Sequence, residues 1–163
     1  VVISSGGVSV GEADYTKDIL TELGEIGFWK IAMKPGKPFA FGKLPNSIFF
    51  GLPGNPVSAL VTFYKLAIPG IEKMQGMPFK PAAKFSAIST SKLKKSPGRM
   101  DFQRAVVSYD EQGVAQVTST GTQGSGVLTS LGKANCFIVL DSEQGSVAEG
   151  DKVFVEPFAF AFQ

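Results

Sequence analysis

The chain changes its pattern near the middle, and this change constrains the fold more than any other feature. In the first half, apolar segments alternate with glycine-bearing loops and with helical spacing, as in the strand-like segment 1–5, the loop 6–11 and the helix that Gly24 ends. A strand, a glycine-rich loop and a helix in this order form half of a parallel β-α-β unit. In the second half, short alternating segments separated by turn residues are typical of a small barrel or sandwich.

A stretch rich in glycine and proline, residues 75–83, separates the two halves and is predicted to be a linker. A chain of 163 residues can hold two small domains. We therefore expect an α/β domain with a partial parallel sheet and helices in residues 1–75, and an all-β, barrel-like domain in residues 76–163. The chain opens on Val1-Val2-Ile3, in the middle of a strand pattern, so we expect a fragment of a longer protein.

Individual elements follow from the same periodicities. In the first domain we expect strands at 25–33, 39–44 and 47–52, the last two forming a hairpin. A helix is predicted from Pro56 to about Met74, with a kink or break at Pro69. In the second domain, the predicted strands are 85–90, 102–109, 115–120, 136–140 and 152–157.

Composition excludes several classes of function. The net charge of +2 is too small to indicate a nucleic-acid partner, and no apolar run reaches the ~18 residues of a membrane helix. The sequence has no histidine, which excludes Ser-His catalysis and histidine-rich metal sites. The single cysteine, Cys136, lies in an apolar strand pattern, so we expect a buried thiol and a reducing, cytoplasmic compartment.

The loop Lys34-Pro35-Gly36-Lys37-Pro38 lies in a run from Ile26 to Ile71 that contains no acidic residue. Two prolines restrict φ and the glycine between them can adopt positive φ, so the lysines are carried on a stiff loop. Such a loop suits an anion held between two ammonium groups. A solvated basic turn is the alternative interpretation.

Three glycine-bearing loops in the first half, at 6–11, 34–38 and 51–56, follow strands. Loops after parallel strands gather at one edge of the sheet, and helix N-termini there favour anions. The spacing of the glycines fits neither a Walker loop nor a dinucleotide fingerprint. We predict an oxyanion or phosphate site at this edge.

Other polar residues admit two interpretations each. Asp14 caps the following helix or holds Mg²⁺ near the site. Ser58 bonds an anion or its own backbone, and Lys30 points into the site or to solvent. In the second half, the basic segment 92–99 is a solvated loop unless Arg99 contributes a guanidinium to an oxyanion, and the segment 120–126 is a flexible polar loop or a ligand loop.

Together these segments resemble the molybdopterin molybdenumtransferases, a bacterial family related to the plant and gephyrin E domains. The resemblance covers the whole chain, and three motifs in the same order make it specific. They are Ser4-Ser5-Gly6-Gly7-Val8-Ser9-Val10-Gly11-Glu12-Ala13-Asp14-Tyr15, Lys34-Pro35-Gly36-Lys37-Pro38 and Gly51-Leu52-Pro53-Gly54-Asn55-Pro56-Val57-Ser58-Ala59. A fourth segment, Pro97-Gly98-Arg99-Met100-Asp101-Phe102-Gln103-Arg104, resembles the start of the family's C-terminal β domain.

The resemblance implies insertion of molybdenum from molybdate into adenylylated molybdopterin, with release of AMP and with Mg²⁺ as cofactor. It implies a catalytic role for Asp14, Lys30 and Lys34, with Asp14 as a Mg²⁺ ligand. The implied molybdate-binding residues are Lys34, Lys37, Pro38, Ser58, Arg99 and Ser125. The implied phosphate and pterin loops contain Gly6, Gly7, Ser9, Gly54 and Asn55.

Members of this family are homodimers whose cleft also uses the N-terminal region of the other subunit. That region is absent from this chain, so we expect the fragment to be inactive alone. The alternative from another class is a non-catalytic scaffold or binding module of the gephyrin E-domain type. A generic phosphate-binding α/β domain is a third interpretation.

Overall fold

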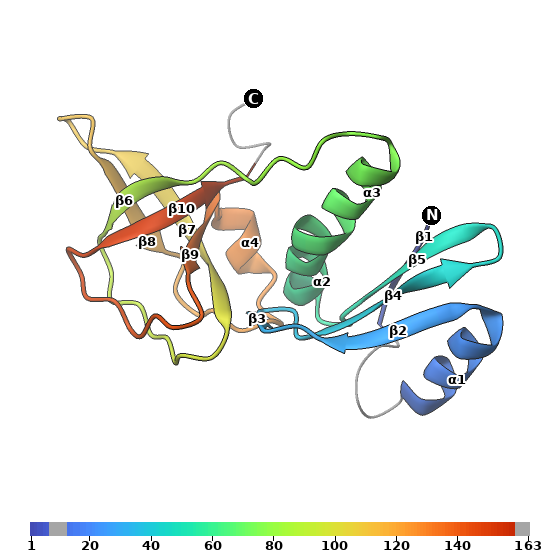
Figure 1. The fold of residues 1–163 in the computed structure, drawn as a ribbon. Coiled ribbons are helices and arrows are strands. Elements are labelled where there is room, and N and C mark those ends of the chain that lie inside the picture. The colour runs from blue at the N-terminus through green and yellow to red at the C-terminus, as the bar shows by residue number, and fades with distance from the viewer. Residues whose placement is uncertain (7–12, 159–163) are drawn as a thin grey trace. The chain divides into compact units, whose positions relative to one another are not determined.

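The computed structural model describes residues 1–6 and 13–158, with residues 13–17 described as backbone only. The chain forms two compact units, and Figure 1 shows the elements of each. Unit 1 comprises Val1–Ile31 and Pro35–Phe79, and unit 2 comprises Ala32–Lys34 and Lys80–Gln163. The short segment 32–34 thus belongs to the second unit, although its sequence neighbours on both sides belong to the first.

Unit 1 contains a four-stranded sheet in the order β1-β5-β4-β2. Its strands are β1 (Val2–Ser5), β2 (Glu25–Lys30), β4 (Pro38–Leu44) and β5 (Ser47–Leu52). Strand β1 pairs parallel with β5, whereas the β5–β4 and β4–β2 pairs are antiparallel. The predicted parallel sheet is therefore a mixed sheet with one parallel pair, because short connections join antiparallel strands and only a long crossover joins parallel ones.

Helices cover both faces of this sheet (Figure 1). Helix α1 (Ala13–Leu23) contributes Leu20 to a cluster around Ala40 and Phe49. On the other face, residues of α2 (Pro56–Thr62), η1 (Phe63–Ala67) and α3 (Ile68–Met74) pack against Phe50 and its neighbours. A Cβ at Gly70 would lie 3.0 Å from the Phe50 ring, so this glycine lets the helix approach the sheet closely.

The predicted helix 56–74 is continuous, and Pro69 does not break it. It consists of α2 (Pro56–Thr62), one π-helical turn η1 (Phe63–Ala67) and α3 (Ile68–Met74). Proline lacks an N–H and its ring clashes with the carbonyl four residues earlier in an ordinary helix. The π turn widens the helix immediately before Pro69, and the Ile68 N–H donates to the Phe63 carbonyl five residues back. The widened turn explains how the helix continues through the proline.

Unit 2 is a five-stranded closed barrel, in the strand order β7-β8-β6-β10-β9, which the β7–β9 pair closes (Figure 1). Its strands are β6 (Phe85–Ser89), β7 (Met100–Tyr109), β8 (Ala115–Ser119), β9 (Cys136–Leu140) and β10 (Lys152–Pro157). Each lies within two residues of its predicted bounds. The barrel core includes Leu93, Val117 and Ile138, which are at most 1% exposed. The fold class, an α/β part followed by a small β barrel, is confirmed.

Two short elements of unit 2 differ from the sequence prediction. Strand β3 (Met33–Lys34) pairs parallel with the start of β7, so the predicted strand 25–33 is two strands in two different sheets. The Met100 N–H also donates to the Ala32 carbonyl over 3.0 Å. Helix α4 (Thr129–Lys133) was not predicted. Within the described ranges, no helix has both the length and the apolar character needed to span a membrane.

Candidate functional site

The predicted loops of unit 1 meet at one edge of its sheet. Strands β1 and β5 are parallel, so their carboxyl ends lie at the same edge, and β4 begins there because it runs antiparallel to β5. Strand β2, antiparallel to β4, ends at this edge too, with Lys30 as the register partner of Pro38. Topology therefore places the loops after β1, β2 and β5 side by side, as the sequence predicts.

Two glycines of these loops lie in close contact. Gly6 has a φ of 90°, and its N–H donates to the Leu52 carbonyl over 3.0 Å. A Cβ at Gly54 would lie 3.6 Å from the Cα of Gly6. The Ser5 hydroxyl donates to the Pro53 carbonyl over 3.3 Å and ties the two loops together. Backbone rather than side chains thus lines this part of the edge.

Helix α2 begins at the same edge. Asn55 has extended φ and ψ of −71° and 126° at the N-cap, its carbonyl accepts the Ala59 N–H over 2.8 Å, and Pro56 is in the first turn. The predicted helix start is therefore confirmed. Ser58, in the first turn, is buried.

The lysine loop is divided between the two units. Gly36 adopts a φ of 106°, a conformation that glycine adopts readily, and the Ile31 N–H donates to the Lys37 carbonyl over 2.8 Å. Lys37 is exposed and belongs to unit 1, together with Lys30 and Pro38. Lys34 lies on β3 and belongs to unit 2. The predicted joint action of Lys34 and Lys37 on one anion stays a prediction.

Three predicted site residues cannot be placed as side chains. Gly7 and Ser9 lie outside the described residues. Asp14 is the second residue of α1, but its side chain is outside the described part. Its roles as a catalytic carboxylate and as a Mg²⁺ ligand remain predictions.

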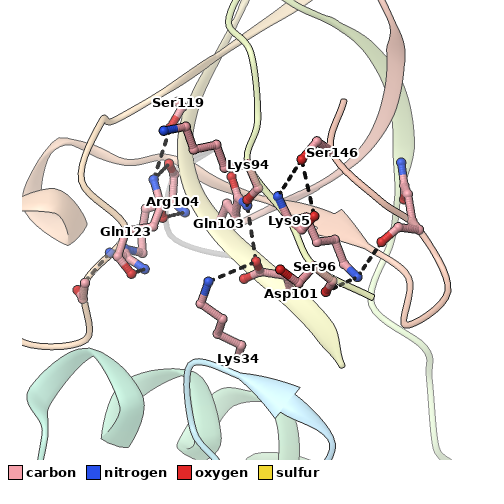
Figure 2. Close-up of polar contacts among 12 residues, drawn as sticks. Lys34, Lys94, Lys95, Ser96, Asp101, Gln103, Arg104, Ser119, Gln123 and Ser146 are labelled. Atoms are coloured by element: carbon pink, nitrogen blue, oxygen red, sulfur yellow. Dashed lines mark hydrogen bonds and ion pairs between the residues drawn. The ribbon is translucent and has the colours of Figure 1, made fainter. Parts of the chain in front are cut away.

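In unit 2, Lys34 is tied to a buried carboxylate. Its Nζ lies 3.6 Å from Oδ2 of Asp101, whose side chain is 5% exposed, and Figure 2 shows this ion pair. Gln103 Nε2 donates to the same carboxylate over 3.2 Å and to the Lys94 carbonyl over 3.0 Å. The carboxylate thus fixes Lys34, while half of the lysine side chain stays exposed.

Arg104 is fully buried and shapes the neighbouring loop (Figure 2). Its guanidinium donates to the carbonyls of residues 122, 123 and 124 over 3.3, 3.3 and 3.1 Å, and to the Ser130 hydroxyl over 2.9 Å. Burial lowers the pKa of Arg104, and the nearby Asp101 carboxylate opposes that shift. Arginine nevertheless stays charged in proteins, so a permanent cation holds this loop.

Gln123 also ties the loop to β7. Its Oε1 accepts the backbone N–H of Arg104 over 2.8 Å, and its Nε2 donates to the carbonyl of the same residue over 3.0 Å. Nε2 also lies 3.1 Å from the Ser119 hydroxyl oxygen, which accepts a bond there. The predicted polar loop 120–126 is therefore held by a buried arginine and a glutamine amide.

The basic segment 92–99 divides into two kinds of residue. Lys95 is 8% exposed, and its Nζ donates to the carbonyls of Ser96, Ser142 and Gln144, so its role is structural. Lys92, Lys94 and Arg99 are exposed. The prediction of a solvated loop is therefore wrong for Lys95, because backbone carbonyls accept hydrogen bonds from its buried ammonium group.

A groove of about 490 Å³ opens on unit 2 beside these loops. Three lysines line it, with polar side chains and backbone of the loop 121–124. The lining residues are Lys34, Lys92, Leu93, Lys94, Gln103, Ser119, Gly121, Thr122, Gln123 and Gly124. The predicted Arg99 and Ser125 are not among them. Apart from Lys34, none of the lining residues was a predicted site residue. The loop 120–126 was predicted to be a flexible polar loop or a ligand loop, and the basic segment 92–99 a solvated loop unless Arg99 binds an oxyanion.

Cys136 is buried on β9, and burial raises the pKa of its thiol to about 12. The predicted buried, unreactive thiol is confirmed in position. No group of three acidic or cysteine side chains within the described ranges could hold a metal ion.

Comparison with known proteins identifies both units. Residues 1–73 match the family described as "Probable molybdopterin binding domain", and residues 86–158 match the family described as "MoeA C-terminal region (domain IV)". The chain is 58% identical to a molybdopterin molybdenumtransferase of Haemophilus influenzae over 97% of its length, and 33% identical to gephyrin of Dictyostelium discoideum over 94%. A crystal structure of a molybdopterin biosynthesis MoeA protein from Pyrococcus horikoshii covers 96% of the chain, with a TM-score of 0.71 and 32% identity.

These relatives are longer than the chain. It spans 39% of the Haemophilus protein, 24% of the Dictyostelium protein and 37% of the Pyrococcus chain. The two family matches follow each other in the order in which the two units occur, and together they account for the sheet unit and the barrel unit. The chain is therefore a segment that belongs to the molybdopterin molybdenumtransferase family.

Proposed function

We propose that the protein to which this chain belongs inserts molybdenum from molybdate into adenylylated molybdopterin and releases AMP. The observation that carries the proposal is the 58% identity to a protein named molybdopterin molybdenumtransferase, over 97% of the chain. The loops at the sheet edge of unit 1 supply backbone and lysines of the kind that an oxyanion needs. This protein acts as an enzyme in molybdenum cofactor biosynthesis under this proposal.

Residue roles in this proposal follow the family's motifs. Lys34, Lys37, Pro38, Ser58, Arg99 and Ser125 bind molybdate, while Asp14 and Lys30 serve catalysis. The loops with Gly6, Gly7, Ser9, Gly54 and Asn55 receive the phosphate and pterin parts. Positive side chains that reduce the negative charge on molybdate make it easier for a dithiolene sulfur to attack, which is electrostatic catalysis.

Asp14 is the only residue to which the proposal assigns Mg²⁺ binding. The described residues contain no group of three acidic side chains that could hold a metal ion, and the Asp101 carboxylate is engaged by Lys34 and Gln103. Mg²⁺ is often held by one or two carboxylates together with substrate phosphates. A single aspartate fits that mode if the substrate supplies the other oxygens.

The test is a calorimetric titration of the chain with molybdate. We expect Lys37→Ala to weaken molybdate binding about tenfold, because one charge-assisted contact contributes about 1.5 kcal/mol. Lys43→Ala is the matched control, since Lys43 is also exposed, lies in the same acid-free run and belongs to no motif. Equal affinities in all three proteins would contradict the molybdate site.

A second measurement separates the enzyme from a scaffold of the gephyrin type. Under the proposal, the chain binds molybdate but shows no molybdenum insertion alone, because the family's cleft needs the N-terminal region of a second subunit. The longer protein is expected to sediment as a homodimer and to fractionate with the cytoplasm. If neither the chain nor the longer protein binds molybdate, the scaffold function is favoured.

A further inference from the structure

The groove on unit 2 is basic and contains no acidic lining residue. Lys34 shares its charge with Asp101, whereas no ion pair of Lys92 or Lys94 is recorded among the described residues. Both are exposed and line the groove from the same segment, one on each side of the buried Leu93. Two ammonium groups without a carboxylate partner favour an anionic ligand.

The loop 121–124, which also lines the groove, offers backbone donors. The Arg104 guanidinium donates hydrogen bonds to the carbonyls of Thr122, Gln123 and Gly124. In a planar trans peptide, the carbonyl and the next N–H point in opposite directions. The N–H groups of Gln123 and Gly124 therefore point away from Arg104, and both residues line the groove. Successive backbone N–H groups on one side of a loop form an anion-binding nest.

A hydroxyl completes the set of donors. The Ser119 oxygen accepts bonds from the Gln123 amide over 3.1 Å and from the Gly121 N–H over 3.3 Å, so its own proton is available to a ligand in the groove. Ammonium groups, backbone N–H groups and a hydroxyl are the donors that recognise a phosphate or a phosphoanhydride. Figure 2 shows Lys34, Lys94, Gln103 and Ser119 around this region.

We propose that this groove binds a phosphate group of the substrate, with Lys92 and Lys94 as its ammonium contacts and the Gln123–Gly124 backbone as its nest. The inference rests on the proposed function for the identity of the substrate, which carries phosphate on both its pterin and its adenylate side. The groove chemistry itself is that of any phosphate ester or phosphoanhydride. Arg104 acts as a positioning residue, since it contacts the loop and not the ligand.

Titration with inorganic pyrophosphate tests the groove without molybdenum chemistry. We expect the double substitution Lys92→Ala/Lys94→Ala to weaken pyrophosphate binding at least tenfold. The control Lys84→Ala/Lys152→Ala removes the same charge from exposed lysines outside the groove and should change affinity less than twofold. Pyrophosphate should also shift the backbone amide NMR signals of Gln123 and Gly124.

Each result has a defined meaning. Equal losses in the two double variants, no loss in either, or unshifted loop amides would overturn the proposal. If AMP competes with pyrophosphate, the groove is assigned to the adenylate side of the substrate. If pyrophosphate binds and AMP cannot displace it, the groove is assigned to the pterin phosphate. Both results uphold a phosphate site. A failure of the proposed function would appear in the molybdate titration instead, because that titration depends on Lys37 and not on Lys92 or Lys94.

Discussion

Replacing Arg104 tests whether a buried cation organises the loop 122–124. Arg104→Met keeps much of the side-chain volume but removes four hydrogen bonds, two of them at 2.9 and 3.1 Å and two at 3.3 Å. Hydrogen bonds to a charged group contribute about 1.5–3 kcal/mol each, so the two shorter bonds account for about 3–6 kcal/mol. Relief of the guanidinium's desolvation offsets part of this. We expect the free energy of unfolding of unit 2 to fall by about 3 kcal/mol.

Hydrogen exchange measured by mass spectrometry resolves the two units in one sample. In Arg104→Met, peptides from β7 and from the loop 122–124 should exchange faster, while the fluorescence of Trp29, the single tryptophan and a residue of unit 1, should report unchanged urea unfolding. Arg99→Met is the control, because Arg99 is exposed and lies just before the same strand. A difference from the control of less than 1 kcal/mol in unit 2 would mean that the guanidinium does not hold the loop.

Two further predictions concern the cores. Because burial raises the pKa of Cys136 to about 12 from its ordinary value of 9.0, the unfolded chain loses the thiol proton first, and stability falls between pH 9 and 12. Between pH 8 and 10.5, wild type should therefore lose about 2 kcal/mol more than Cys136→Ala in urea unfolding, and identical pH slopes would contradict this. Gly42→Ala should destabilise unit 1 by about 2–3 kcal/mol, since its Cβ would meet the Glu25 carbonyl and lie 2.5 Å from Ile26 Cα. Gly145→Ala, with no atom within 4 Å of the new Cβ, should change thermal stability little, and equal effects of both changes would argue against the close approach.

The sequence predicted the barrel strands well because each is a short apolar or alternating segment that turn residues bound, as β9 and β10 show. Strand β3 escaped prediction because a two-residue strand has no period, and its pairing with β7 joins residues 33 and 100, far apart in the sequence. Helix α4 is also short, with five residues. The continuous helix through Pro69 depends on a π turn, which local propensity does not reveal.

The candidate site was predictable in part. Glycine loops and lysines indicated an anion site at the edge of unit 1, and strand topology alone brings those loops to one edge. For the groove of unit 2, the sequence indicated the basic segment 92–99 and the loop 120–126 separately, but not that they meet, because their meeting depends on the closure of the barrel. The role of Arg104 could not be read either, since its partners are backbone carbonyls that carry no sequence signal.

Because Arg104 binds backbone carbonyls, the path of the loop 122–124 does not depend on which side chains the loop carries. Arg104 holds main-chain oxygens, which every amino acid possesses, so exchanging the side chains of Thr122 or Gly124 for others that fit the same backbone leaves its grip intact. The four acceptors are neutral groups, three carbonyls and a hydroxyl, so none of these hydrogen bonds depends on the ionisation of its acceptor. Side chains at the rim of the groove can therefore be exchanged, while one buried arginine preserves the path of the backbone beneath them.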